Sequence, residues 1–302
     1  MRILSGIFSL TICLLLTAET AFPSEYGRYG SYGRQGGRYS QEFLVINRPP
    51  NIQGLTGLMI MNTAFTQKTG HMAFGISALG ENSDTPDYSI VQGVATLTMG
   101  ITDNLEFGAK GKFIATDLGS SLTREQGFGD TEVALKWRIR NQSEEGTIPA
   151  IALGIGGIIP TGDSAKGFEE VRKQGLKFMV IASAENRVLD DSFVGIHFEG
   201  QAVLVDQIAG NAPPTQEMYG VVNAGLHFPF NENNHLQFMI EYNQVTKKDI
   251  PTLREGNYQA VSAGLRYVTK HFNITAGGQF LNKEQAGVDD TVRLVGTMSL
   301  NY

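Results

Sequence analysis

The residues of this sequence best suited to chemistry are charged side chains that recur on one face of alternating polar and apolar segments. In residues 131–139, Glu132, Lys136 and Arg138 share one face, and Trp137 lies on the other. Charged groups in an enclosed polar passage can orient and select a solute. Groups of opposite sign can instead pair and close that passage. Both interpretations stay open for the candidates of this kind, which are Glu106, Lys110, Lys112, Glu132, Lys136, Arg138, Lys177, Glu199, Glu241, Arg266 and Arg293.

Catalysis is not indicated by the histidines and serines. A lipid hydrolase built on a membrane-spanning sheet needs a histidine beside a serine on the lipid side, because the imidazole must deprotonate the hydroxyl. Two histidines, His197 and His227, fall on the polar face, and the other three lie at strand starts: His71, His235 and His271. No serine occupies an outward neighbouring position, and no Gly-Xaa-Ser-Xaa-Gly motif occurs. We therefore expect no enzyme.

Resident metals and cofactors are not indicated either. Asp190-Asp191 lies in a predicted turn and Asp289-Asp290 opens a predicted strand. Either pair could contact a divalent cation at the level of lipopolysaccharide, but solvated carboxylates are the simplest interpretation. Cys13 is the only cysteine, which excludes intramolecular disulfides and cysteine-rich zinc sites. We expect no cofactor and no metal.

The overall composition narrows the class of protein. The chain has 302 residues, of which 41% are hydrophobic and 18% charged, and its mean hydropathy is −0.11. A polytopic helical membrane protein needs several apolar runs of roughly 20 residues, and only the N-terminus approaches one. A net charge of −6 argues against nucleic acid as a partner.

The N-terminus has the pattern of an exported protein. Arg2 precedes an apolar run from Ile3 to Thr17, and small residues offer a cleavage point between 18 and 24. We expect a signal peptide over residues 1–21. Residues 22–41 form a Gly/Tyr/Arg-rich tail that cannot bury enough apolar area to fold. The tail is interpreted as a periplasmic linker or as an adhesive strip for anionic groups.

The rest of the chain repeats one period. Segments of about ten residues alternate apolar and polar positions between Gly, Asn, Asp and Pro, which is the strand signal. Helical periodicity is almost absent. The predicted strands are 71–80, 91–100, 104–114, 130–140, 148–159, 176–186, 192–205, 217–229, 235–245, 258–268, 272–281 and 290–302.

The lengths of the links between these strands indicate how the sheet is arranged. Short links such as Ile101 to Asn104 alternate with long ones such as Pro160 to Gly175, which is typical of an outer-membrane β-barrel. In lipid an open sheet edge is too costly, so the predicted all-β sheet of residues 70–302 must close. Residues 42–69 are predicted to be an irregular entry segment, and one interpretation is that it folds partly into the lumen. Two weak strands within it, Glu42 to Ile46 and Leu58 to Phe65, would raise the count from twelve to fourteen.

Glycines fall on the same polar face as the charges. They would leave room there for a solute path or for bulky neighbours. They are Gly108, Gly154, Gly195, Gly225, Gly264 and Gly277.

One region resembles a known family. The stretch from Gly127 to Arg138, followed by Pro149 to Gly154 and Ile159 to Asp163, is similar to the signature of the MetA-pathway-of-phenol-degradation family. Gly100 to Gly108 is similar to the hairpin before that signature. The resemblance covers residues 90–165 and implies an outer-membrane barrel of a family associated with transport and, in part, with aromatic-compound degradation.

Two functions remain open for such a barrel. The first is a passive channel or transporter for a small solute, hydrophobic or aromatic in the sense of the resemblance. The second is a non-conducting barrel that scaffolds an export system, a surface polymer or a periplasmic partner. For either, we expect a Gram-negative outer-membrane location and contacts with membrane lipids and lipopolysaccharide. The C-terminal strand, which ends at Tyr302, is expected to engage the barrel-assembly machinery.

Overall fold

The computed structural model describes residues 49–84, 87–117, 124–143, 148–166, 168, 171, 174–189, 192–206, 216–229, 236–246, 258–269, 271–283 and 291–302. The expected signal peptide and tail, the weak strand Glu42 to Ile46, the two aspartate pairs and His235 lie outside these residues. Within the described ranges, no helix is long and apolar enough to cross a membrane.

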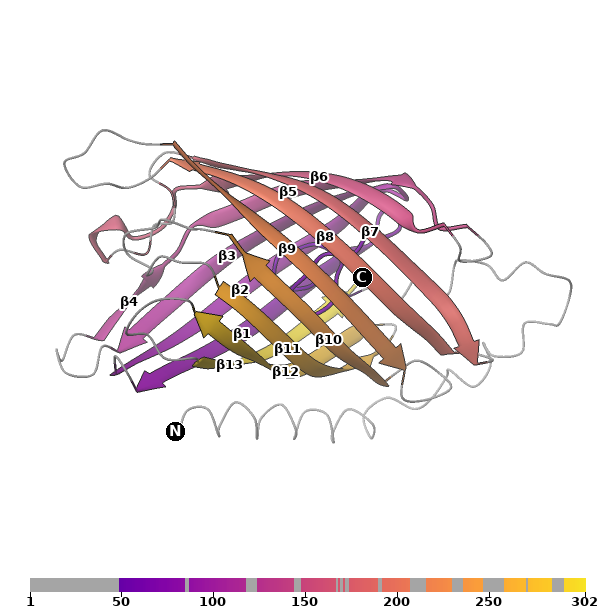
Figure 1. The fold of residues 1–302 in the computed structure, drawn as a ribbon. Coiled ribbons are helices and arrows are strands. Elements are labelled where there is room, and N and C mark those ends of the chain that lie inside the picture. The colour runs from indigo at the N-terminus through magenta and orange to yellow at the C-terminus, as the bar shows by residue number, and fades with distance from the viewer. Residues whose placement is uncertain are drawn as a thin grey trace, which may run out of the picture.

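Twelve antiparallel strands form a closed barrel, and a further short strand extends its wall. Figure 1 shows these strands steeply inclined around a common interior. The predicted closed all-β barrel is therefore confirmed. The strands are β1 (Met72–Asp84), β2 (Asp87–Thr102), β3 (Leu105–Asp117), β4 (Arg124–Phe128), β5 (Thr131–Arg140), β6 (Ala150–Ile159), β7 (Gly175–Leu189), β8 (Ser192–Asp206), β9 (Gln216–Pro229), β10 (Leu236–Val245), β11 (Tyr258–Val268), β12 (Phe272–Lys283) and β13 (Thr291–Asn301).

The barrel closes where β1 meets β13. These strands pair from Ala73 opposite Asn301 to Asn82 opposite Val292. The backbones of Met72 and Tyr302 add reciprocal hydrogen bonds of 3.0 and 2.8 Å. Closure leaves no open edge in the ring, so the backbone groups of its strands are satisfied by neighbouring strands.

The alternation of the sequence becomes an inside and an outside. On β5, Trp137 is 57% exposed, whereas its neighbour Lys136 is fully buried. On β3, Phe113 is exposed and Glu106 is buried. Because successive side chains of a strand point to opposite faces, apolar residues face lipid and charged residues face the lumen.

The two ends of the barrel differ. Short turns such as Thr102 to Leu105, between β2 and β3, mark what we call the short-turn end. The opposite, long-loop end carries β4 and a 3-10 turn at Ser164–Lys166. These two elements lie together at the left of Figure 1.

Two links at the long-loop end differ from the prediction. Part of the predicted loop Thr116 to Gly127 is strand, because β3 extends to Asp117 and pairs there with β4. Phe113 and Phe128 support that pairing by an edge-to-face contact with centroids 5.7 Å apart. β1 and β2 also extend beyond their predicted ends, so that they meet at Asp84 and Asp87.

Substituting arginine on the lipid face should cost stability according to depth. Val180, near the middle of β7, is 59% exposed, and Ile139, at the end of β5, is 46% exposed. We expect Val180→Arg to lower the free energy of unfolding from bilayers by about 2–4 kcal/mol, because a charge at the midplane loses its hydration. The matched variant Ile139→Arg should lose only about 0–1 kcal/mol. Denaturant titration of protein refolded into vesicles measures both, and equal losses would contradict this orientation of the wall.

Candidate functional site

The N-terminal part of the described chain lies inside the barrel. We call residues 49–69 the plug. Its apolar side chains Leu55, Met59 and Met61 are at most 1% exposed. In Figure 1 this segment is the indigo irregular trace enclosed by the strands. The predicted weak strand Leu58 to Phe65 is part of this plug and not of the wall, so it adds no strand to the twelve of the barrel.

The plug is a compact set of turns. Bridges join Pro50 to Thr56 and Gly57 to Asn62. Gly54 has φ of 82°, which favours glycine, and a Cβ there would lie 2.7 Å from the backbone oxygen of Ala109 on β3. The plug backbone therefore packs directly against the wall.

Glu241 of β10 holds the tip of the plug. Its carboxylate accepts hydrogen bonds from the backbone N–H groups of Met59, Ile60 and Met61, with those of Ile60 and Met61 at 3.0 Å. Successive N–H groups that converge in this way form a nest for an anion. The nest makes the buried carboxylate a ligand of the plug and not a group open to solvent.

An ion pair holds the next turn. Lys136 Nζ lies 2.9 Å from Glu106 Oε1, and both side chains are fully buried. Glu106 also accepts the N–H groups of Thr56 and Gln67 at 2.8 Å, while Lys136 donates to the carbonyls of Thr56 and Thr63. The desolvation of a buried pair is offset only when its remaining hydrogen-bonding capacity is filled, and here the plug fills it.

Two further wall residues complete the attachment. Glu199 accepts the backbone N–H of Asn62 at 3.0 Å. Arg266 donates to the carbonyls of Gly57 at 3.0 Å and Leu58 at 2.6 Å. The predicted candidates that bind backbone groups of the plug are thus Glu106, Lys136, Glu199, Glu241 and Arg266.

Four of the six predicted inward glycines lie against the plug, namely Gly108, Gly225, Gly264 and Gly277, whereas Gly154 and Gly195 lie against wall side chains. A Cβ on Gly225 would lie 2.5 Å from Met61 Sδ, and one on Gly277 would lie 2.8 Å from Met59 Sδ. The sequence suggests two roles for these glycines, a solute path or room for bulky neighbours. At the plug, Gly225, Gly264 and Gly277 make room for its methionine side chains.

A second charged cluster lies on the long-loop side of these contacts. Glu132 Oε1 is 2.8 Å from Lys110 Nζ and 3.3 Å from Lys112 Nζ, and Glu132 Oε2 is 2.8 Å from Lys177 Nζ. Lys110 lies four positions along β3 from Glu106, roughly 13 Å nearer the long-loop end. Three ammonium groups surround one carboxylate, so the cluster has an excess of two positive charges. We call it the lysine cluster.

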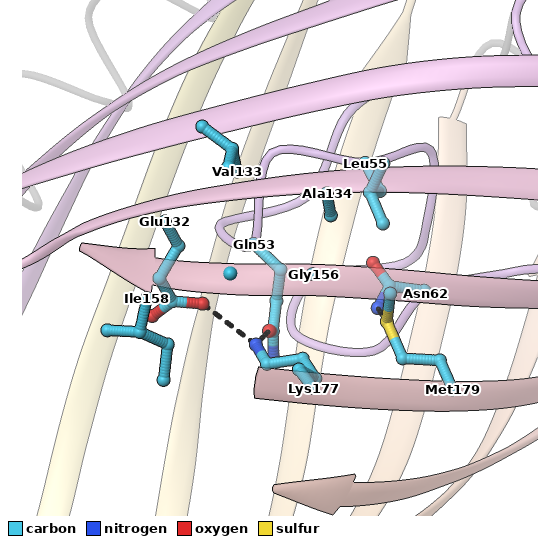
Figure 2. A pocket seen from close by; sticks show the side chains of 11 residues that line it. Gln53, Leu55, Asn62, Glu132, Val133, Ala134, Gly156, Ile158, Lys177 and Met179 are labelled. Carbon is cyan, nitrogen blue, oxygen red and sulfur yellow. Dashed lines mark hydrogen bonds and ion pairs between the residues drawn. The ribbon is translucent and has the colours of Figure 1, made fainter. Parts of the chain in front are cut away.

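A small cavity is lined by residues of both the lysine cluster and the plug. Its volume is about 10 Å³, enough for about one water molecule. Figure 2 shows Lys177 pointing toward Glu132, with Gln53 of the plug beside them. The plug thus reaches the lysine cluster with little space between.

The remaining candidates lie apart from both clusters. Arg293 of β13 binds Glu81 of β1 at 2.8 Å across the closing pair of strands. Arg138 lies on the rim of the short-turn end, where it donates to Asp103 and Asn104. Its position on the inward face was predicted, but its partners are turn residues.

The chain leaves the plug at the same rim. Thr69 donates its backbone N–H and its hydroxyl to Asp103 Oδ1, at 3.0 and 2.7 Å. These bonds favour the ionised carboxylate and hold the pKa of Asp103 below its usual value. The turn between β2 and β3 therefore fixes the point where the plug joins β1.

Comparison with known proteins identifies the fold. No family model and no curated protein sequence matches this chain. An outer membrane channel from Pseudomonas putida F1 is similar in structure, with 11% identity, a TM-score of 0.59, and coverage of 81% of this chain and 100% of that chain. The NanC porin has 10% identity and a TM-score of 0.49 over 74% and 98% of the two chains. LpxR from Salmonella typhimurium has 12% identity and a TM-score of 0.48 over 76% and 99%. The described chain has the fold of an outer-membrane β-barrel.

Removing the charge of Glu241 should loosen the plug. In Glu241→Gln, one amide oxygen replaces two carboxylate oxygens, and the amide NH₂ faces N–H donors. Each hydrogen bond to a charged group contributes about 1.5–3 kcal/mol. We expect hydrogen exchange of the amides of Met59 to Met61 to rise at least about tenfold, which corresponds to 1.4 kcal/mol.

The matched control for this change is Glu81→Gln. Glu81 is also a buried carboxylate, but it binds Thr291 and Arg293 of β13. It should leave exchange in the plug unchanged. Equal exchange in both variants would show that the carboxylate nest does not hold the plug.

Proposed function

We propose that this protein is an outer-membrane channel for a small anionic solute, and that the plug closes its lumen. The observation that carries this proposal is the polar character of the plug attachment. Buried carboxylates, a lysine and an arginine of the wall hold the plug through its backbone, whereas a purely structural filling would need only apolar side chains. Such an attachment can be exchanged for solute and water at less cost than an apolar core, because both of these can satisfy the same polar groups.

The lysine cluster supports the choice of an anion. Its excess positive charge lies in a confined, low-dielectric lumen, where a fixed charge acts more strongly than in bulk water. A carboxylate solute can pair with one of these lysines in place of Glu132. Together with the resemblance to the MetA-pathway-of-phenol-degradation family, this favours small aromatic acids as a class to test first.

The likeness to the Pseudomonas putida F1 outer membrane channel agrees with this function but concerns the fold.

The second candidate, a non-conducting barrel, is favoured by one specific observation. The cavity between Gln53 of the plug and Lys177 of the wall holds about one water molecule, since its volume is about 10 Å³. The two candidates therefore differ in whether the plug moves.

A reversible tether of the plug decides between them. Ala64 N lies 2.9 Å from Ser183 Oγ of β7, so cysteines at both positions can be tested for a disulfide. Cys13 falls within the expected signal peptide, so these two would be the only cysteines of the mature chain. In planar bilayers we expect the oxidised Ala64→Cys/Ser183→Cys protein to be closed, and reductant to restore the discrete openings of the wild type.

Each single-cysteine variant serves as a control and should not respond to reductant. Equal conductance of the oxidised and reduced double variant would show that solute bypasses the plug. Silence of the wild type and of the reduced variant at all voltages would favour the non-conducting barrel.

The lysine cluster should set the ion selectivity. Two unit charges 4 Å apart interact by about 1 kcal/mol in bulk water and more strongly at lower dielectric, so each lysine raises the local anion concentration in the lumen by roughly fivefold or more. Lys112→Gln should therefore lower the ratio of chloride to potassium permeability, measured as a reversal potential in a KCl gradient. Lys166→Gln is the matched control, because Lys166 pairs with Asp163 at the long-loop end. An unchanged ratio in Lys112→Gln would contradict the anionic solute.

A further inference from the structure

Three potential metal ligands from adjacent strands converge on the lumen wall. They are Glu185 of β7, His197 of β8 and His227 of β9. One ligand atom of each lies within 4.8 Å of those of the other two. All three side chains are buried, and His197 is completely so. They lie in the short-turn half of the barrel, beside the plug.

The register of the wall produces this convergence. Glu185 pairs with Gly195, and Gly195 pairs with His227 in the next strand. His197 lies two positions from Gly195 and therefore on the same inward face. Neighbouring strands are about 4.8 Å apart, so side chains from three strands reach one point above the glycine.

Gly195 keeps that point free. A Cβ on Gly195 would lie 2.3 Å from His227 Nδ1 and 2.6 Å from His197 Nε2. Any larger residue would occupy the space toward which both ring nitrogens point. Glycine is needed at this position because any side chain would clash with the two nitrogens that would coordinate an ion.

The distances suit a small transition-metal ion. His197 Nε2 and His227 Nδ1 are 3.0 Å apart. Around a tetrahedral ion with metal to nitrogen bonds of 2.0–2.1 Å, two ligand atoms are roughly 3.3 Å apart. A small opening of the ring pair therefore admits an ion in place of the proton that the two nitrogens share. Two imidazoles and one carboxylate form a ligand set that Zn²⁺ accepts, with a fourth position left for water.

The surroundings orient the ligands as they do in metal sites. His197 Nδ1 lies 2.9 Å from Ser183 Oγ, which fixes the ring and leaves Nε2 toward the site. Gln142 exchanges two hydrogen bonds with the backbone of Glu185, at 2.7 and 2.8 Å. Phe65 of the plug covers the ring of His197 edge-on, with centroids 6.3 Å apart.

We propose that Glu185, His197 and His227 bind one divalent transition-metal ion, with Zn²⁺ the best match, and that the bound ion secures the plug. The connection to the plug is Ser183, whose hydroxyl oxygen accepts the backbone N–H of Ala64 at 2.9 Å while it contacts His197. An ion that fixes His197 also fixes the hydroxyl that holds Ala64. This proposal does not depend on conduction.

Zinc titration of the full mature chain tests the site. The protein is made without a polyhistidine tag, refolded in detergent and stripped with EDTA. We expect one Zn²⁺ per chain in competition with a chromophoric chelator, and a visible d–d spectrum of intensity typical of four-coordination when Co²⁺ replaces it. His227→Gln should weaken Zn²⁺ binding at least about tenfold, as loss of a ligand requires.

Matched controls separate the site from other histidines. His271→Gln changes a histidine in the turn between β11 and β12 and should bind Zn²⁺ as the wild type does. Gly195→Ala leaves all ligands in place but fills the gap, and it should also lose binding. Heat-modified electrophoretic mobility checks that each barrel is folded. Absence of stoichiometric Zn²⁺ binding by the wild type, or binding by His227→Gln equal to that of the wild type, would overturn the site.

Hydrogen exchange tests the connection to the plug. Zn²⁺ should slow exchange of the Ala64 amide in the wild type at least about threefold and leave it unchanged in His227→Gln. Binding of Zn²⁺ without slower exchange at Ala64 would overturn the securing role of the ion.

Discussion

A hydrocarbon environment offers no hydrogen bonds, and this constraint governs the whole protein. The backbone groups of a lipid-facing sheet can be satisfied only if its first and last strands pair, as β1 and β13 do. Once the ring is closed, the apolar side chains face lipid, and the polar and charged side chains must face the lumen. The charges gathered inside are thus a consequence of the membrane as much as of function.

Those charges then impose a requirement of their own. A carboxylate or ammonium that leaves water needs partners, and a wall of side chains on regular strands supplies them only in part. The plug supplies the missing ones as backbone groups, at Glu106, Glu199, Glu241, Lys136 and Arg266. Its turns leave N–H and C=O groups free for this purpose, whereas a helix would bond them internally and a sheet would bond them to neighbouring strands. The irregular shape of the plug therefore follows from its partners.

The sequence predicted the wall well because alternation is a local property. Trp137 outside and Lys136 inside follow from the two-residue period alone, and the observed strands match the predicted ones to within a few residues at most ends. The prediction that residues 42–69 enter the lumen rested on their irregular pattern, with Pro49, Pro50 and several glycines. The described residues 49–69 do lie there, and Leu58 to Phe65, which the sequence suggested as a weak strand, is mostly buried among them.

Contacts between distant residues could not be predicted from one sequence. Nothing local pairs Met59 with Glu241, and the meeting of His197, His227 and Glu185 depends on the register of three strands. Whether Glu132 faces one lysine or three likewise depends on which strands are neighbours. The sequence placed Glu132, Glu241, His197 and His227 on the inward face but not beside their partners.

The bond between Met59 and Glu241 also has a consequence for assembly. The two residues are 182 positions apart, so the bond forms only after most of the chain has been synthesised and exported. Until the plug enters, a carboxylate remains dehydrated or draws water into the lumen, and the barrel is correspondingly less stable. A barrel whose strands have closed around an empty centre is therefore expected to be less stable than one that holds its plug, and a gain in stability on entry of the plug would mark the finished protein.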